Sequence, residues 1–261
     1  MSWNPDQYLR FAEPRLRPAV DLLARIALPA PKRVVDLGCG AGNVTRLLAE
    51  RWPQAQITGV DDSAAMLAKA QQALPSVHWL QAGIAEWAAV QQGMADAPDL
   101  IFSNAALQWL PDHGRLFPAL LKLLPPGGVL AVQMPRNHAA PSHTMVTETV
   151  MAGPWRERLQ HVAAHAPVAE PADYFEMLVG AAEPIDIWEC EYLQVLHGAD
   201  PVKEWTKGTW LKQFLDALPP DEAPRFEAEY AERVRAAYPA LPDGRTLFPF
   251  KRLFIVAQKK A

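Results

Sequence analysis

The feature that most constrains this chain is a glycine-rich turn near its start. An apolar run at residues 33–37 leads into Gly38, Gly40 and Gly42, after which residues 44–50 have the spacing of a helix. Glycines let backbone amides approach a ligand closely, and a helix N-terminus offers unpaired N–H groups. This strand–turn–helix order predicts a nucleotide-like ligand, although a turn that needs only positive φ angles would show the same glycines.

The strand-then-helix pattern recurs through the first half of the chain. Further strands are predicted at residues 56–61, 77–81, 98–103 and 129–134, and helices at 64–70 and 112–124. Residues 82–87 follow the strand at 77–81, and residues 105–110 follow the strand at 98–103. Strands that are almost entirely apolar and alternate with helices specify a parallel sheet covered on both faces. Right-handed crossovers make that sheet doubly wound, so the predicted fold class is α/β with a Rossmann-like, mostly parallel sheet.

After residue 135 the pattern changes to helices interrupted by two strands. Helices are predicted at residues 141–152, 155–165, 172–182, 201–217 and 220–238, and strands at 185–196 and 252–258, the last one antiparallel. We interpret residues 1–261 as a single domain. Its predicted parts are an N-terminal lid with a first helix from Pro18 (1–30), a cofactor-binding core (31–135) and helical cap insertions (136–184 and 197–250). Such insertions are expected over the carboxyl ends of the strands, where these sheets bind ligands.

Composition argues against several classes of function. Half of the 261 residues are apolar and the net charge is −4, which gives no electrostatic reason to expect nucleic acid or a membrane as partner. No apolar run has the length of a membrane span, and the N-terminus lacks the pattern of a secretory signal. With only two cysteines, one of them Cys39 in the turn, we expect no disulfide, no metal site and a cytoplasmic location. A monomer or weak homodimer is expected.

The spacing of the glycines distinguishes between ligand classes. A dinucleotide fingerprint requires a third glycine where Asn43 stands, and no Gly-Lys-Ser/Thr follows, so NAD, FAD and a phosphate-binding loop are disfavoured. The turn matches the Asp-x-Gly-x-Gly-x-Gly pattern of class I S-adenosylmethionine-dependent methyltransferases. Asp61 at the end of the second strand and Pro-Pro-Gly-Gly at 125–128 also match. The chain therefore resembles this superfamily, which implies a Rossmann-like methyltransferase fold and S-adenosyl-L-methionine as cofactor.

Longer blocks resemble one family within that superfamily. Residues 3–5, 8–9, 17–20, 107–113, 129–135, 187–188 and 252–257 resemble the trans-aconitate 2-methyltransferases. The resemblance implies methyl transfer to a carboxylate of trans-aconitate, or of a similar small polycarboxylate, to give a monomethyl ester. The alternatives are the same fold acting on another small acid, a phenol or an amine, or a protein that binds the cofactor without catalysis.

The resemblance places the methionine part of the cofactor against the glycine turn. The residues that shape this turn are Asp36, Gly38, Cys39, Gly40 and Asn43. Asp61 and Asp62 follow the second strand, where a carboxylate can accept hydrogen bonds from both ribose hydroxyls. Asp61 is the better candidate because it ends the strand directly, whereas Asp62 fits an exposed turn or a cap equally well.

The remaining cofactor contacts are assigned from positions after later strands. Met66 packs either on adenine or in the core. Gly83 stands where the superfamily commonly has an acid that accepts from the adenine amino group, so Ile84 is left to hold the ring through backbone and apolar contact. Asn104 is expected to meet the amino group of the cofactor. Arg17 is expected to pair with the methionine carboxylate or with the substrate.

The acceptor determines which catalytic groups are needed. A carboxylate is already ionised at neutral pH, since its ordinary pKa is about 4, so no general base is required. Positioning, desolvation and cationic donors are required instead. Catalytic contacts are expected from Tyr8, Gln108 and Trp109, with core packing as the alternative for Trp109. The substrate-binding candidates are Arg15, Arg136, His138, Trp205, Lys207 and Arg252.

Overall fold

The computed structural model describes residues 12–93, 96–163 and 168–261, which divide into two compact units. The sheet unit contains Arg15–Pro135, Val168–Cys190 and Arg252–Ala261. The helical unit contains Arg136–Pro167 and Glu191–Lys251, together with Met1–Pro14, as far as these ranges are described. One segment of the sheet unit ends at Pro135, and the helical unit continues from Arg136.

In the described part of the chain, the sheet has seven strands in the order β3-β2-β1-β4-β5-β7-β6. The strands are β1 Arg33–Leu37, β2 Gln56–Asp61, β3 His78–Gln81, β4 Leu100–Asn104, β5 Val129–Pro135, β6 Ala182–Leu196 and β7 Thr246–Lys259. Strands β1 to β5 pair in parallel, and β7 pairs antiparallel with β5. The predicted doubly wound sheet with an antiparallel last strand is therefore confirmed. The strand order reverses between β1 and β4, so ligands are expected at the carboxyl ends of these two strands.

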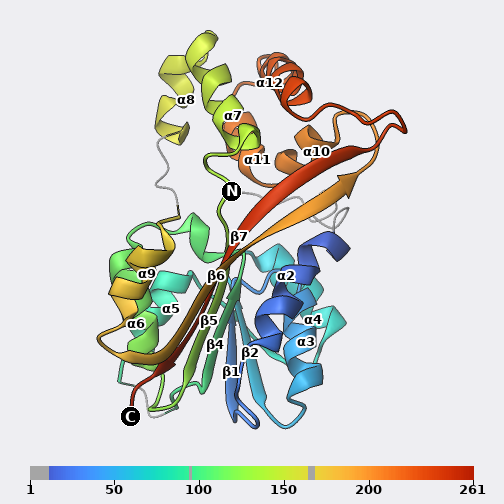
Figure 1. The fold of residues 1–261 in the computed structure, drawn as a ribbon. Coiled ribbons are helices and arrows are strands. Elements are labelled where there is room, and N and C mark those ends of the chain that lie inside the picture. Colours follow the sequence, from blue (N-terminus) through green and yellow to red (C-terminus); the bar gives the residue numbers. More distant parts are fainter. Residues whose placement is uncertain (1–11, 94–95, 164–167) are drawn as a thin grey trace. The chain divides into compact units, whose positions relative to one another are not determined.

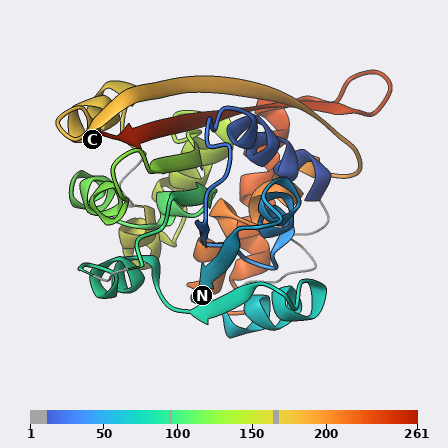
Figure 2. The same cartoon turned by 90° about the horizontal axis from the view of Figure 1, so that it is seen from below.

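Helices of the sheet unit cover both faces of its strands (Figures 1 and 2). One face carries α2 Ala12–Ala24, α3 Asn43–Arg51 and α4 Ala64–Ala73, and the other carries α5 Ile84–Val90, α6 His113–Leu123 and α9 Pro171–Leu178. This double cover explains the apolar strands, because both faces exclude water. Leu100, Ile101 and Phe102, which are consecutive in β4, are all fully buried.

Two predicted helices differ from those observed in the sheet unit. The helix predicted from Pro18 is α2, which begins at Ala12 among the described residues, so Pro18 lies inside it. Proline lacks one backbone N–H, so α2 loses one hydrogen bond there without ending. The second difference is α9, which was predicted within the cap insertion at 136–184. It packs on α6 because Tyr174 and Leu178, four residues apart, enter the same apolar core as Phe117.

The helical unit contains α7 Pro141–Ala152, α8 Arg156–Ala163, α10 Pro201–Lys207, α11 Trp210–Asp216 and α12 Ala223–Ala237. The predicted helix at 201–217 is thus split between α10 and α11 at Gly208 and Thr209. Aromatic pairs form the core of this unit, among them Trp155 with Phe226, whose ring centroids are 5.1 Å apart. Within the described residues, none of the helices combines the length and the apolar character that a membrane span requires.

Candidate functional site

The glycine turn is tied to the end of β2 through Asp61. The amide of Gly40 donates to Oδ2 of Asp61 at 2.9 Å, and the amide of Ser63 donates to Oδ1 at 2.9 Å. Each carboxylate oxygen keeps a second lone pair, so Asp61 can still accept hydrogen bonds from two hydroxyls. Partial burial raises the pKa of Asp61, and the two amide bonds oppose that rise. The neighbouring Asp62 is exposed, and its carbonyl accepts from Gln81 Nε2 at 3.2 Å.

Asp36 lies inside the turn rather than on its surface. Its side chain is 1% exposed, and Oδ2 accepts a hydrogen bond from the Thr45 hydroxyl at 2.6 Å. Burial raises the pKa of Asp36 to about 7, against the lowering effect of the Thr45 bond. Asp36 therefore joins β1 to α3 and shapes the turn. Burial also raises the pKa of the adjacent Cys39 thiol. Thr45 was not among the predicted residues, since its role appears only when the helix returns over the strand.

The loops after β1, β3 and β4 meet at Gly38. A Cβ atom on Gly38 would lie 2.2 Å from the Cβ of Ala106 and 3.7 Å from Cδ1 of Ile84, and φ at Gly38 is +72°. Neither the contact nor the φ angle suits another residue. By contrast, a Cβ on Gly40 or Gly83 would meet nothing within 4 Å. Open space therefore lies beside the turn and at the start of α5, where the cofactor was predicted to bind.

Asn104, the last residue of β4, offers an acceptor at the same edge of the sheet. Its Oδ1 atom is buried and receives no hydrogen bond from the residues that the structure describes. An unsatisfied buried acceptor costs about 1–3 kcal/mol, so a ligand N–H placed there would be favoured. The ammonium group of S-adenosylmethionine is such a donor, and the residues present fit this cofactor.

The residues predicted to contact adenine differ in their exposure. Met66 is 7% exposed, and its amide donates to the Ser63 hydroxyl at the start of α4. Its side chain is thus largely in the core, which was the alternative weighed for it. Gly83 is the N-cap of α5, and Ile84 is the first residue of that helix and half-buried. Asn43 is the first residue of α3 and is exposed.

The segment after β4 carries the predicted catalytic residues Gln108 and Trp109. They lie in the short 3-10 helix η1, Leu107–Trp109. Gln108 is 8% exposed and its Nε2 donates to the Ala105 carbonyl at 2.7 Å, whereas Trp109 is half-buried. The segment is bracketed by two non-glycine residues in the left-handed region, Ala105 at φ 56° and Asp112 at φ 57°. Such backbone is strained and persists only where its surroundings hold it.

His113 and Tyr174 hold this segment in place. Nε2 of His113 lies 2.9 Å from the Leu107 carbonyl and Nδ1 lies 2.6 Å from the Tyr174 hydroxyl. A carbonyl only accepts, so Nε2 carries the hydrogen, and in the neutral ring Nδ1 accepts from Tyr174. The Tyr174 oxygen accepts in turn from the amide of Ala169 at 3.3 Å. Helix α9 therefore supports η1 through α6. Neither side chain was predicted as a site residue, because they are 61 residues apart.

Comparison with known proteins places the chain in a family. Residues 8–176 match the profile of a methyltransferase domain family. Trans-aconitate 2-methyltransferase of Azoarcus sp. is 51% identical over 98% of both chains, and that of Variovorax paradoxus is 46% identical over 100% of both. The chain belongs to the trans-aconitate 2-methyltransferase family.

Solved structures agree with this family at the level of the fold. The YcgJ protein of Bacillus subtilis has a TM-score of 0.58 and 17% identity, with 94% of this chain and 99% of that chain covered. The phosphoethanolamine N-methyltransferase 2 of Haemonchus contortus, solved with S-adenosyl-L-methionine, has a TM-score of 0.55 and 17% identity. That match covers 94% of this chain and 53% of the other.

Of the residues predicted to bind the substrate of this trans-aconitate 2-methyltransferase family member, Arg252 lies in the sheet unit. Arg252 is 4% exposed, lies opposite Pro135 in the β5–β7 ladder, and its Nη1 donates to Gln133 Oε1 at 3.2 Å. Gln133 was not predicted, although a polar residue within the apolar run of β5 was the available signal. Arg17 is exposed on α2. Tyr8 lies outside the described residues, as does the side chain of Arg15.

The other residues that were predicted to bind the substrate belong to the helical unit. Trp205 is 1% exposed and packs against Phe248 and Phe250, so its ring is part of the aromatic core. Nζ of Lys207 donates to both carboxylate oxygens of Glu227, at 2.7 and 2.8 Å. The ammonium group of Lys207 is thus engaged in an ion pair.

Arg136 and His138 come directly after β5 in the sequence and belong to the helical unit. The amide of Arg136 donates to the Lys251 carbonyl at 3.0 Å. His138 lies beside His143 and Trp210, with ring centroids 5.7 and 6.0 Å away. Burial lowers the pKa of His143 to about 3, so that ring is neutral at physiological pH. The structure thus brings His138 into a cluster of aromatic rings.

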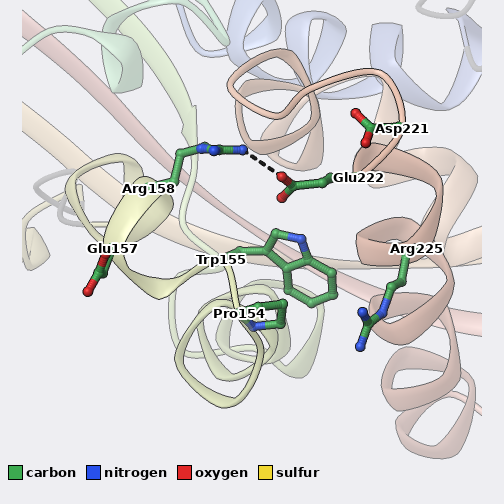
Figure 3. Close-up of a pocket in the computed structure, with 7 residues that line it drawn as sticks. All are labelled: Pro154, Trp155, Glu157, Arg158, Asp221, Glu222 and Arg225. Atoms are coloured by element: carbon green, nitrogen blue, oxygen red, sulfur yellow. Dashed lines mark hydrogen bonds and ion pairs between the residues drawn. The ribbon is translucent and has the colours of Figure 1, made fainter.

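A cavity of about 660 Å³ lies in the helical unit between the start of α8 and α12 (Figure 3). Its charged lining has both signs, and Nη1 of Arg158 donates to Glu222 at 2.9 Å. The guanidinium of Arg225 lies 5.5 Å from the centroid of the buried Trp155 ring. None of the residues predicted from the sequence lines this cavity.

Proposed function

We propose that this protein transfers a methyl group from S-adenosyl-L-methionine to a carboxylate of trans-aconitate or a similar small polycarboxylate, forming a monomethyl ester. The assignment of S-adenosyl-L-methionine as methyl donor rests on one observation: Asp61 and Asn104 offer hydrogen-bond acceptors at the edge of the sheet where the glycine turn leaves open space. The identity of the methyl acceptor is supported by the name of the relatives, which are 46–51% identical over nearly the whole chain.

The cofactor site works by holding a ligand rather than by reacting with it. S-adenosylmethionine supplies a methyl group on a positively charged sulfur. Asp61, fixed by the amides of Gly40 and Ser63, accepts hydrogen bonds from the ribose hydroxyls. Asn104 Oδ1 accepts from the amino group at the end of the neighbouring strand. Ala106 closes the turn against Gly38, so the backbone that faces the ligand is preorganised.

The acceptor step needs no proton transfer within the enzyme. A substrate carboxylate is ionised at neutral pH, so its oxygen is already nucleophilic. The protein has to place that oxygen about 3 Å from the methyl group and exclude water, and positioning of this kind can lower a barrier by about 7–11 kcal/mol. We propose that Gln108 and Trp109 line the methyl site. Both belong to η1, which follows Asn104 closely in the sequence.

Turnover with an acceptor panel tests this proposal. Purified protein is incubated with methyl-labelled cofactor and trans-aconitate, other polycarboxylates, monocarboxylic acids, phenols or amines, and the products are identified by mass spectrometry. We expect a monomethyl ester from trans-aconitate. Turnover of phenols or amines without any polycarboxylate would refute the acceptor class. Calorimetric binding of the cofactor without methylation of any acceptor would refute catalysis.

We also propose a cytoplasmic location. The free thiols of Cys39 and Cys190 support it, since cysteines remain reduced in that compartment. Fractionation of cells that produce the tagged chain tests the location. Recovery of the protein in the periplasmic or membrane fraction would contradict it.

A further inference from the structure

Gln133 is a polar side chain in the middle of an apolar strand and is fully buried. Its Oε1 accepts a hydrogen bond from Nη1 of Arg252 at 3.2 Å. Because a guanidinium can only donate, this bond fixes the orientation of the amide, and Nε2 points elsewhere. Among the residues that the structure describes, Nε2 of Gln133 has no hydrogen-bond partner. A buried amide with two unused N–H groups costs about 1–3 kcal/mol, so an acceptor is missing from this position.

Asn104, Gln133 and Arg252 form a row across three neighbouring strands. Asn104 is the register partner of Gln133 in the parallel β4–β5 pair. In the antiparallel β5–β7 pair, Gln133 lies opposite Phe254 and Pro135 lies opposite Arg252, which makes Gln133 and Arg252 diagonal neighbours. Register partners and diagonal neighbours present their side chains on the same face of a sheet. The row therefore places two donor side chains beside the proposed amino-group acceptor, at the carboxyl end of the parallel strands.

We propose that Gln133 and Arg252 form a carboxylate-binding site. The guanidinium supplies a positive charge, and the Gln133 amide supplies a neutral donor that its bond to Arg252 holds in place. Arg252 is 4% exposed and Gln133 is fully buried, so hydrogen bonds from this pair act where water is excluded and are correspondingly strong.

Two ligands of the proposed reaction have carboxylates, and both have the chemistry that this site fits. One is the acceptor acid, and the other is the cofactor through its methionine part. This site rests on the proposed function for the identity of both ligands. Binding measurements separate them without turnover, because the acid can be titrated into protein saturated with S-adenosylhomocysteine, and the cofactor can be titrated alone.

The decisive variant is Gln133→Glu. It keeps the size of the side chain and still accepts from Arg252, so the fold is retained, but it replaces the free donor by a negative charge. We expect the dissociation constant of one of the two carboxylate ligands to rise by about 10- to 100-fold, the equivalent of one lost charge-assisted hydrogen bond. Arg252→Met should weaken the binding of the same ligand, whereas Arg252→Lys should bind that ligand more tightly than Arg252→Met does.

Gln258→Glu is the matched control. Gln258 lies on the same strand, β7, opposite Val129 at the other end of β5, and its Nε2 donates to the Gly127 carbonyl at 3.0 Å. The control makes the same charge change and should leave both dissociation constants within about twofold of the wild type. Weakened binding of trans-aconitate or of the cofactor by Gln133→Glu would support the proposal. The titration in which binding is weakened identifies the ligand whose carboxylate the site holds. Unchanged binding of both ligands by Gln133→Glu would overturn it. Failure of the wild type to methylate any acid would instead count against the proposed function.

Discussion

The buried carboxyl group of Asp36 should make the stability of this protein fall as pH rises towards neutrality. Its pKa is raised from 3.8 to about 7 by burial, while Thr45 donates to it and the charge of Asp61 raises it further. Between these two values the folded protein keeps a proton on Asp36 that the unfolded chain has released. The unfolded state therefore binds fewer protons, and each pH unit in this window favours unfolding by about 1.4 kcal/mol.

The substitution Asp36→Asn removes this titration while keeping an oxygen that accepts the Thr45 hydroxyl. Integration between the two pKa values gives the variant an advantage over the wild type that grows by about 3 kcal/mol from pH 4.5 to 7.5 and then levels off. Urea unfolding of both proteins at several pH values measures this difference in free energy. Asp221→Asn, which removes an exposed negative charge, is the control. A difference between wild type and Asp36→Asn that stays constant or shrinks across this range would refute the reasoning.

Three further substitutions test the site. Gly38→Ala should abolish cofactor binding and lower the melting temperature, because its Cβ would lie 2.2 Å from a neighbouring Cβ at a φ of +72°; Gly180→Ala, whose Cβ meets nothing within 4 Å, should be tolerated in both assays. Asp61→Ala should weaken cofactor binding by about 10- to 100-fold in calorimetry, and unchanged affinity would disprove the ribose assignment. Tyr174→Phe removes the hydroxyl bonded to His113 and should lower kcat about tenfold with cofactor affinity within twofold. Trp52→Phe, which removes the hydrogen bond that Nε1 donates to the Leu28 carbonyl, should lower stability but not kcat.

Local sequence patterns predicted most of the sheet unit. Parallel strands buried on both faces are almost entirely apolar, so β1, β2, β4 and β5 were recognisable within one or two residues. Ser63 stands directly before α4, where a hydroxyl can satisfy an orphan amide, and its Oγ accepts from the Met66 amide at 3.3 Å. The positions of Asp61 and Asn104 followed from the rule that strand ends meet at one edge.

Interactions between distant parts of the chain could not be predicted in this way. The bonds between Gln133 and Arg252 and between His113 and Tyr174 join residues 119 and 61 positions apart, and no periodicity encodes such a pairing. The side chain of Trp205 carries no local signal of its surroundings either, since an aromatic residue on a helix suits a core and a ligand pocket alike. Its burial against Phe248 depends on where β7 returns.

The position of β7 has a consequence for how this sheet can form. Strand β7 follows β5 and β6 in the sequence but lies between them in the sheet. Until β7 is present, β5 lacks one neighbour and β6 has no partner in the sheet. A chain that stops before β7 therefore leaves one edge of the apolar strand β5 unpaired, which favours aggregation or recognition by chaperones. Deletion of β7 should thus remove β6 from the sheet as well.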